Sequence, residues 1–236
     1  MVPYLIFGAI GHGMTCVQLY IQGDKIWYHY ILSPIKCILN QGAPIGNLAL
    51  WFLPSLFAVQ LLYSLMRKRM RDEWIVLIGL TIAYSVFIFE IKRPFYLGNI
   101  PLGLAVYSFG HLLKTKQYTR LIFILALLVY LVTLFLHPYS LDFRANRIGN
   151  GYYLIAVISS LVGCILINNI FKRKIVHINF LKWIGNNSMN FYVMHWLVLY
   201  ACSSIIDVSG WGLFAIMITS CIIILPIMSV LYNKII

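Results

Sequence analysis

The chain has 236 residues, of which 61% are hydrophobic and only 10% are charged, and its mean hydropathy is +0.87. Because soluble domains carry about 25% charged residues, this composition excludes an ordinary water-soluble protein and predicts a polytopic membrane protein. The net charge is +12, from 18 basic and 6 acidic residues. The basic residues lie in short stretches between apolar runs, which favours the positive-inside pattern of membrane proteins over a nucleic-acid-binding surface.

Several apolar segments approach the length of about 20 residues that a helix needs to cross a bilayer. The predicted spans are residues 3–21, 47–66, 73–91, 99–114, 121–137, 151–170, 188–206 and 211–232. The fourth is short and glycine-rich, which predicts a tilted, broken or partly re-entrant helix. Because backbone groups in lipid must be hydrogen-bonded within the segment, helices are the expected spanning structure. We therefore expect an all-α bundle of about eight transmembrane helices that forms a single domain over residues 1–236.

The distribution of basic residues predicts the orientation of the bundle. If the spans alternate in direction, 12 of the 18 basic residues fall on one side. They are Arg67, Lys68, Arg69, Arg71, Lys114, Lys116, Arg120, Lys172, Arg173, Lys174, Lys182 and Lys234. The positive-inside rule makes this side cytoplasmic, so both ends of the chain are expected in the cytoplasm. The segments expected as outward loops are 22–46, 92–98, 138–150 and 207–210.

The stretch most informative about chemistry is residues 181–196, LKWIGNNSMNFYVMHW. Asn187 or Ser188 is a natural N-cap for the apolar helix that follows, because either side chain can accept a hydrogen bond from an unpaired backbone N–H. At 100° per residue, Ser188, Tyr192 and His195 fall on one stripe of this helix. His195 would lie about 10 Å past the helix start, inside the hydrocarbon layer. It is therefore either a packing group that bonds a neighbouring helix or a substrate-binding or catalytic group.

Three further polar sets interrupt the apolar background. Trp51 and Ser55 lie one turn apart near the outer end of the second span, where Trp51 could bind a substrate or belong to the interfacial aromatic belt. Glu90, Lys92 and Arg93 form either a solvated ion-pair cluster or a site for an anionic sugar or phosphate. The third set, in the 138–150 loop, holds Asp142, Arg144, Asn146, Arg147 and Asn150. Its donors suit sugar hydroxyls or phosphates, and an ordinary polar loop is the alternative.

Metal-ligand and disulfide patterns give no further signal. Neither a Cys-x-x-Cys nor a His-Glu-x-x-His spacing occurs, so no metal site and no bound cofactor are predicted. The chain has five cysteines, and only Cys37 lies outside the apolar segments, so no disulfide framework is expected.

Three segments resemble the acyltransferase 3 family of integral-membrane O-acyltransferases. FLKWIGNNSMNFYVMHW, which ends at Trp196, resembles the family's C-terminal signature, in which a Gly-x-x-Ser-hydrophobic segment leads to a Tyr-x-x-His end. LALWFLPSLFAVQLLYSL (Leu48–Leu65) resembles its Leu-Trp-Phe-Leu-x-x-Leu helix. NGYYLIAVISSLVGCILI, after Arg147, resembles the helix before the final signature. The three segments occur in the family's order, and the most similar members are sugar O-acetylases of the fucose 4-O-acetylase type.

The resemblance implies a membrane O-acetyltransferase. Acyl-CoA, and acetyl-CoA in particular, is the expected donor, and a hydroxyl of a cell-envelope sugar or lipid-linked glycan is the expected acceptor. A multi-pass protein of the bacterial inner membrane is expected. His195 is the candidate catalytic residue, in a supporting role. The candidate substrate-binding residues are Trp51, Ser55, Arg93, Arg144, Asn146, Arg147, Asn187, Ser188 and Tyr192.

The N-terminal part of the sequence departs from the family pattern. O-acyl transfer needs a base and an oxyanion donor, roles tied in the family to an Arg and a His about ten residues apart on the first transmembrane helix. The only early histidine here is His12, and no Arg precedes it. The start VPYLIFGAIGHG looks instead like the Pro-Tyr helix that follows the family's second span, so the first two helices are expected to be absent.

Two other functions are compatible with the sequence. A transporter or flippase for a lipid-linked sugar would explain polar residues at membrane depth, although no inverted repeat or pair of broken helices is evident. A catalytically inactive family member that only packs or binds a partner would explain the missing Arg/His pair.

Overall fold

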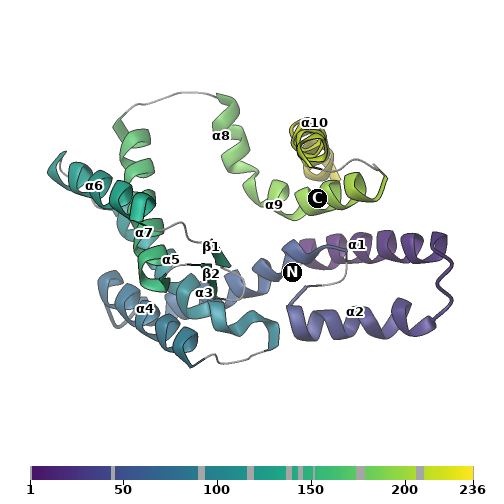
Figure 1. The fold of residues 1–236 in the computed structure, drawn as a ribbon, viewed down its shortest axis with the longest axis horizontal. Coiled ribbons are helices and arrows are strands. Elements are labelled where there is room, and N and C mark those ends of the chain that lie inside the picture. Colours follow the sequence, from purple (N-terminus) through teal and green to yellow (C-terminus); the bar gives the residue numbers. More distant parts are fainter. Residues whose placement is uncertain are drawn as a thin grey trace. The chain divides into compact units, whose positions relative to one another are not determined.

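The computed structural model describes residues 2–43, 46–89, 94–115, 120–136, 140–142, 146–150, 152–173, 179–205 and 210–235. These residues form ten α-helices, two short 3-10 helices and one two-stranded hairpin (Figure 1). The all-α prediction is confirmed for this part of the chain, apart from the hairpin. The chain divides into two compact units, which are unit 1 (Met1–Leu53 with His177–Ile236) and unit 2 (Pro54–Val176).

Unit 1 is built around one central helix, α9. Its elements are α1 (Val2–Ile21), α2 (Trp27–Gln41), η1 (Leu48–Trp51), α8 (Asn179–Asn186), α9 (Ser188–Ile205) and α10 (Trp211–Ile235). Helix α9 packs against α10, α1 and η1. The core between them is apolar and includes Phe7, Leu50, Val193 and Leu197. Burial of these side chains holds α9 in contact with elements from the other end of the sequence.

Unit 2 consists of two pairs of packed helices and a short hairpin. Its elements are α3 (Phe52–Arg67), η2 (Pro94–Asn99), α4 (Asp72–Ile88), α5 (Ile100–Thr115), α6 (Arg120–Leu136), β1 (Ser140–Asp142), β2 (Arg147–Asn150) and α7 (Tyr153–Arg173). Helix α4 packs on α5, and α6 packs on α7. A Cβ atom at Gly79 of α4 would lie 2.8 Å from the carbonyl oxygen of Pro101, so the absence of a side chain allows the close approach of α5.

Each of the eight predicted spans overlaps an α-helix of the structure, although the span 47–66 begins with η1 and α3 starts only at Phe52. Within the described residues, three helical stretches are long and apolar enough to cross a membrane, Tyr4–Ile21, Leu48–Arg67 and Trp211–Tyr232. Large apolar side chains are also exposed on shorter helices, such as Phe135 on α6 at 85%. Exposed apolar surface of this kind suits contact with lipid. The number of spans and the cytoplasmic location of both ends stay predictions.

The expectation that residues 22–46 form a loop was wrong, because the structure has α2 there, and the outward location of this segment stays a prediction. Apolar residues recur at helical spacing in this helix, at Ile31, Ile35, Ile38 and Leu39. With 15 residues α2 is shorter than a transmembrane span, so a search for runs of about 20 residues does not find it. It ends at Gly42, whose φ of 69° is the left-handed conformation that glycine adopts at helix C-termini.

The 138–150 segment and the region before α9 also contain elements that were not predicted. β1 pairs with β2 in an antiparallel ladder whose register is interrupted between Ser140 and Leu141. Helix α8 has only 8 residues and ends directly before the turn that leads into α9. Elements this short contain too few residues for a periodic pattern to identify them.

Two glycine backbones meet where the chain enters η1. Gly46 has a φ of +87°, and a Cβ atom on it would lie 2.1 Å from the carbonyl oxygen of Gly11 in α1. The converse also holds, since a Cβ atom on Gly11 would lie 2.9 Å from the carbonyl carbon of Gly46. Only residues without side chains allow this contact, which brings the segment before η1 against the middle of α1.

The first prediction concerns this contact. Gly46→Ala is expected to lower the free energy of unfolding by about 3 kcal/mol, because the new methyl group meets backbone and the left-handed φ disfavours alanine. Thermal unfolding in detergent micelles measures the effect. Gly13→Ala, on the same helix as Gly11 but with no atom within 4 Å of the added Cβ, is the control and is expected to raise stability by up to about 1 kcal/mol. Equal unfolding temperatures for the two variants would contradict the close approach.

Candidate functional site

Two long-range hydrogen bonds join α9 to the segment that precedes α3. The fully buried Asn47 donates from Nδ2 to the carbonyl oxygen of Val193 over 3.0 Å. The hydroxyl of Tyr192 donates to the carbonyl oxygen of Ala49 over 2.9 Å. These bonds supply partners for polar groups where the backbone is not α-helical, and they determine how α9 lies against η1.

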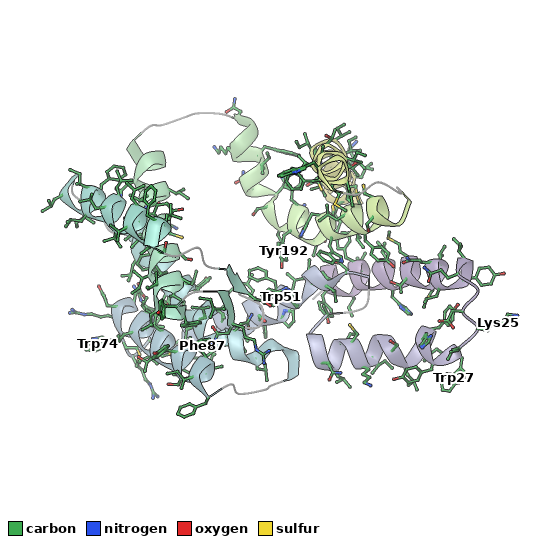
Figure 2. The ribbon with its side chains drawn as sticks, in the orientation of Figure 1. Lys25, Trp27, Trp51, Trp74, Phe87 and Tyr192 are labelled. Atoms are coloured by element: carbon green, nitrogen blue, oxygen red, sulfur yellow. The ribbon has the colours of Figure 1, made fainter. Side chains whose placement is uncertain are left out.

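Aromatic rings gather at the same contact. The ring of Tyr192 lies 5.0 Å from that of Phe52, and the half-buried Trp51 packs edge-on against Phe52 at 5.9 Å. Trp51 and Tyr192 are labelled in Figure 2, on neighbouring segments of unit 1. Two residues singled out in the sequence therefore belong to one aromatic cluster, in which each touches Phe52.

The predicted start of α9 at residue 188 is confirmed, and the N-cap hydrogen bond expected of Asn187 or Ser188 stays a prediction. The helix begins at Ser188, which is exposed, and Asn187 occupies the turn directly before it. The side-chain amide of Asn187 donates to the carbonyl oxygen of Trp183 over 2.9 Å. Asn187 thus satisfies a carbonyl in the last turn of α8 at the point where α9 begins.

The hydrogen bond of His195 determines which of its ring nitrogens carries the proton. Its Nδ1 lies 2.5 Å from the backbone carbonyl oxygen of Tyr192, and the ring is half-buried. A carbonyl oxygen can only accept, so Nδ1 must carry the hydrogen. In the neutral imidazole the lone pair then belongs to Nε2. Nε2 is then the nitrogen that could act as a general base, and the ring is oriented by its own helix.

A cleft of about 470 Å³ lies beside α9 in unit 1. Its walls come from one face of α2, from α9, and from the start of η1 with the chain just before it. The lining consists of Ser33, Lys36, Cys37, Asn40, Gly46, Leu48, Trp196 and Tyr200. The volume falls within the range of small-molecule sites, about 300–1,000 Å³. Trp196 directly follows His195, which is itself not among the described lining residues.

Among the predicted substrate-binding residues of unit 2, Ser55 and Asn146 have side chains that protein groups engage. The buried hydroxyl of Ser55 donates to Oδ1 of Asn99 over 3.4 Å. Asn146, in the left-handed region with φ 50°, is buried and donates from Nδ2 to the carbonyl oxygen of Ala83 over 3.0 Å. Its Oδ1 accepts the hydroxyl of Tyr153 over 2.5 Å. In this structure Asn146 therefore ties the hairpin to α4 and α7.

The remaining predicted residues are exposed or lie outside the described part of the chain. Arg147 is exposed on β2, where it pairs in register with Asp142 of β1. The residues outside the described ranges are Glu90, Lys92, Arg93 and Arg144. The side chain of Asn150 is not described either. The polar sets around Arg93 and Arg144 stay predictions.

Sequence reasoning missed a buried charged cluster in unit 2. Asp72, the first residue of α4, is 4% exposed and pairs with Arg67 of α3. Its carboxylate also accepts from Nδ1 of His111 on α5 over 2.8 Å and from the hydroxyl of Tyr63 over 3.0 Å. Burial alone would raise the pKa of Asp72, but the hydrogen bonds from Arg67, His111 and Tyr63 outweigh it and hold the pKa below its ordinary value.

A local signal for part of this cluster exists in the sequence. Tyr63 and Arg67 are four residues apart and therefore share a helix face, and Asp72 opens the next helix. Arg67 was interpreted only as part of a cytoplasmic basic loop. The contact with His111 has no such signal, because it joins residues 39 positions apart.

The exposed apolar helices and the histidine-bearing α9 define a helical membrane protein with a candidate acid–base group beside a small-molecule cleft. A family model described as an acyltransferase domain matches residues 1–232. The chain belongs to this family, acyltransferase 3, so the resemblance found in the sequence is confirmed and the protein is a membrane acyltransferase in general terms. Comparisons with curated proteins and with solved structures gave no significant match.

The second prediction concerns the buried carboxylate. Asp72→Asn is expected to lower the free energy of unfolding at pH 7 by about 2 kcal/mol, because Arg67 and His111 lose a buried charged partner. Since the folded-state pKa of Asp72 is lowered, its stabilisation is complete above the unfolded-state value of about 3.9 and is lost as pH falls through the folded-state pKa. The gap between wild type and variant should therefore narrow on acidification.

Thermal unfolding in detergent from pH 7 down to pH 3 measures this gap. Glu73→Gln removes the same charge from the adjacent, exposed position and is the control. A loss of stability in Glu73→Gln as large as that in Asp72→Asn would show that the cluster has no special contribution.

The third prediction tests the attachment of α9 to η1. Tyr192→Phe is expected to cost about 1 kcal/mol of unfolding free energy, because the carbonyl of Ala49 loses its donor while the ring contacts are kept. Tyr232→Phe is the matched control, since that ring packs on Phe7 at 5.5 Å and its hydroxyl has no hydrogen bond identified among the described residues. Thermal unfolding in detergent measures the difference. Equal stability of the two variants would show that the Tyr192 hydroxyl does not stabilise the contact between α9 and η1.

Proposed function

We propose that the chain is an O-acyltransferase that moves an acyl group from acyl-CoA, with acetyl-CoA as the donor, to a hydroxyl of a cell-envelope sugar or lipid-linked glycan. The bacterial inner membrane is the proposed location. Family membership supports acyl transfer in a membrane. The observation that carries the proposal within the site is the bond from Nδ1–H of His195 to the carbonyl of Tyr192, which leaves Nε2 as the proton acceptor.

The proposed reaction is a direct transfer from a thioester to an alcohol. In this proposal His195 acts as the base, a role that the resemblance gives to an Arg/His pair not identified in this chain. The acceptor oxygen attacks the thioester carbonyl carbon while Nε2 of His195 takes the hydroxyl proton. The new carbon–oxygen bond gives a tetrahedral oxyanion, and its collapse breaks the carbon–sulfur bond. The departing thiolate then takes the proton from the imidazolium of His195. The products are an O-acyl ester and free CoA thiol, and the histidine returns to its neutral form.

The proposed acceptor site is the cleft beside α9. Its lining combines hydroxyl, amide and ammonium groups with two aromatic rings. One of these rings belongs to Trp196, the residue directly after His195. Sites for small polar molecules have this composition, with apolar walls and a few polar groups that orient the ligand. Tyr192 has a structural role in this proposal, because its hydroxyl already donates to Ala49.

The fourth prediction tests the assignment of His195. In membranes containing the chain, labelled acetyl-CoA should acetylate a lipid-linked glycan fraction, and His195→Ala should lower the rate about 100-fold at unchanged protein level. His195→Gln, which keeps a polar side chain but not a base, should lose as much. His29→Ala is the control, since that side chain is 42% exposed and pairs with Asp24.

The outcomes separate the candidate roles. Unaltered transfer in His195→Ala would reduce His195 to a packing residue. Absence of transfer by the wild-type chain, with movement of a lipid-linked sugar across vesicles, would instead support a transporter.

A further inference from the structure

The cleft in unit 1 has one wall that presents polar groups from a single helix face. Ser33, Lys36, Cys37 and Asn40 of α2 follow the spacing i, i+3, i+4 and i+7, which aligns side chains along a helix. They contribute a hydroxyl, an ammonium, a thiol and an amide. An acyl chain would leave these groups without partners, so the wall suits a ligand that carries hydroxyls and other polar substituents.

The opposite wall is aromatic. Trp196 and Tyr200 lie one turn apart on α9 and both line the cleft. The hydroxyl of Tyr200 donates to Oε1 of Gln18 on α1, which holds this ring against the neighbouring helix. Flat aromatic surfaces pack against the carbon–hydrogen faces of sugar rings, whose hydroxyls point sideways toward polar partners. The two walls together match the amphipathic shape of a sugar ring.

Lys36 gives the cleft a positive charge that the described part of unit 1 does not neutralise. It is the one charged residue in the described lining. The one acidic residue among the described residues of unit 1 is Asp24, and its Oδ2 lies 2.5 Å from Nδ1 of His29. An anionic ligand in the cleft would supply a partner for this charge.

We infer that this cleft binds a sugar ring that carries an anionic group, a phosphate or a carboxylate, and that Lys36 recognises the anion. The inference rests on the proposed function in treating the cleft as the acceptor site, and it adds the chemical class of the acceptor. A lysine ammonium attracts either anion as a point charge without imposing a bidentate geometry. Ser33 and Asn40 would bond the ring hydroxyls, while Trp196 and Tyr200 would pack against the ring.

Equilibrium binding to the purified chain in detergent, followed by calorimetry, tests the inference without requiring acyl transfer. The probes are glucose 1-phosphate, glucuronate, the neutral methyl glucoside and inorganic phosphate. At least one of the charged sugars should bind about tenfold more tightly than methyl glucoside, the effect of one partly solvated ion pair. Tighter binding of glucose 1-phosphate would indicate a phosphate ligand, and tighter binding of glucuronate a carboxylate. Inorganic phosphate should bind more weakly than glucose 1-phosphate, because it lacks the ring.

Matched variants locate the charge effect. Lys36→Gln should remove the preference for charged sugars and leave binding of methyl glucoside unchanged, and Lys36→Arg should retain most of the preference. Lys25→Gln, in the turn between α1 and α2, removes an equal charge outside the cleft lining and should change nothing (Figure 2). Trp196→Leu should weaken binding of all three sugars. Retention of the charge preference in Lys36→Gln, equal binding of charged and neutral sugars by the wild type, or equal binding of inorganic phosphate and glucose 1-phosphate would each overturn the inference.

The outcome is separable from that of the transfer experiment. A chain that transfers no acetyl group but shows Lys36-dependent binding would retain this inference and contradict the proposed reaction. A chain that acetylates a glycan but binds charged and neutral sugars equally would support the proposed reaction and contradict this inference.

Discussion

The arrangement of unit 1 depends on hydrogen bonds to a short stretch of buried chain that is not α-helical. Between α2 and α3 the chain contacts the middle of α1 through Gly46, and the next residues are almost completely buried. Polar groups inside an apolar protein in lipid are costly without partners. Helix α9 supplies one acceptor and one donor to this stretch, because the carbonyl of Val193 accepts from Asn47 and the hydroxyl of Tyr192 donates to the carbonyl of Ala49. The position of α9 therefore follows from the irregularity of the segment that it contacts.

This dependence connects packing with the proposed chemistry. Tyr192 and His195 of α9 have different roles. The hydroxyl of Tyr192 bonds η1, and its backbone carbonyl orients the ring of His195. Trp196, one residue further, lines the cleft. A helix held by long-range bonds provides the rigid support that an oriented base needs. The same attachment that stabilises the unit thus sets the geometry in which His195 and the cleft lie along one helix.

Unit 2 also contains buried polar side chains whose partners come from other elements, and one of these side chains, Asp72, is charged. Asp72 is surrounded by Arg67, His111 and Tyr63, so its ionised carboxylate has three donors, two from α3 and one from α5. Asn146 is similarly engaged at both ends of its amide. In each case a buried polar side chain joins two or more elements. Losing a partner would leave the buried side chain of Asp72 or Asn146 with fewer hydrogen bonds, which is costly.

The sequence by itself determined the helical class, the location of eight of the helices, the start of α9 at Ser188 and the family. It did so because hydropathy, helical spacing and helix caps are local properties, and helix hydrogen bonds join residues four positions apart. Only the tertiary structure decided that Tyr192 bonds Ala49 across 143 positions and that Lys36 and Trp196 line one cleft. These relations depend on which apolar faces meet in three dimensions, and one sequence without that geometry contains no local pattern that specifies them.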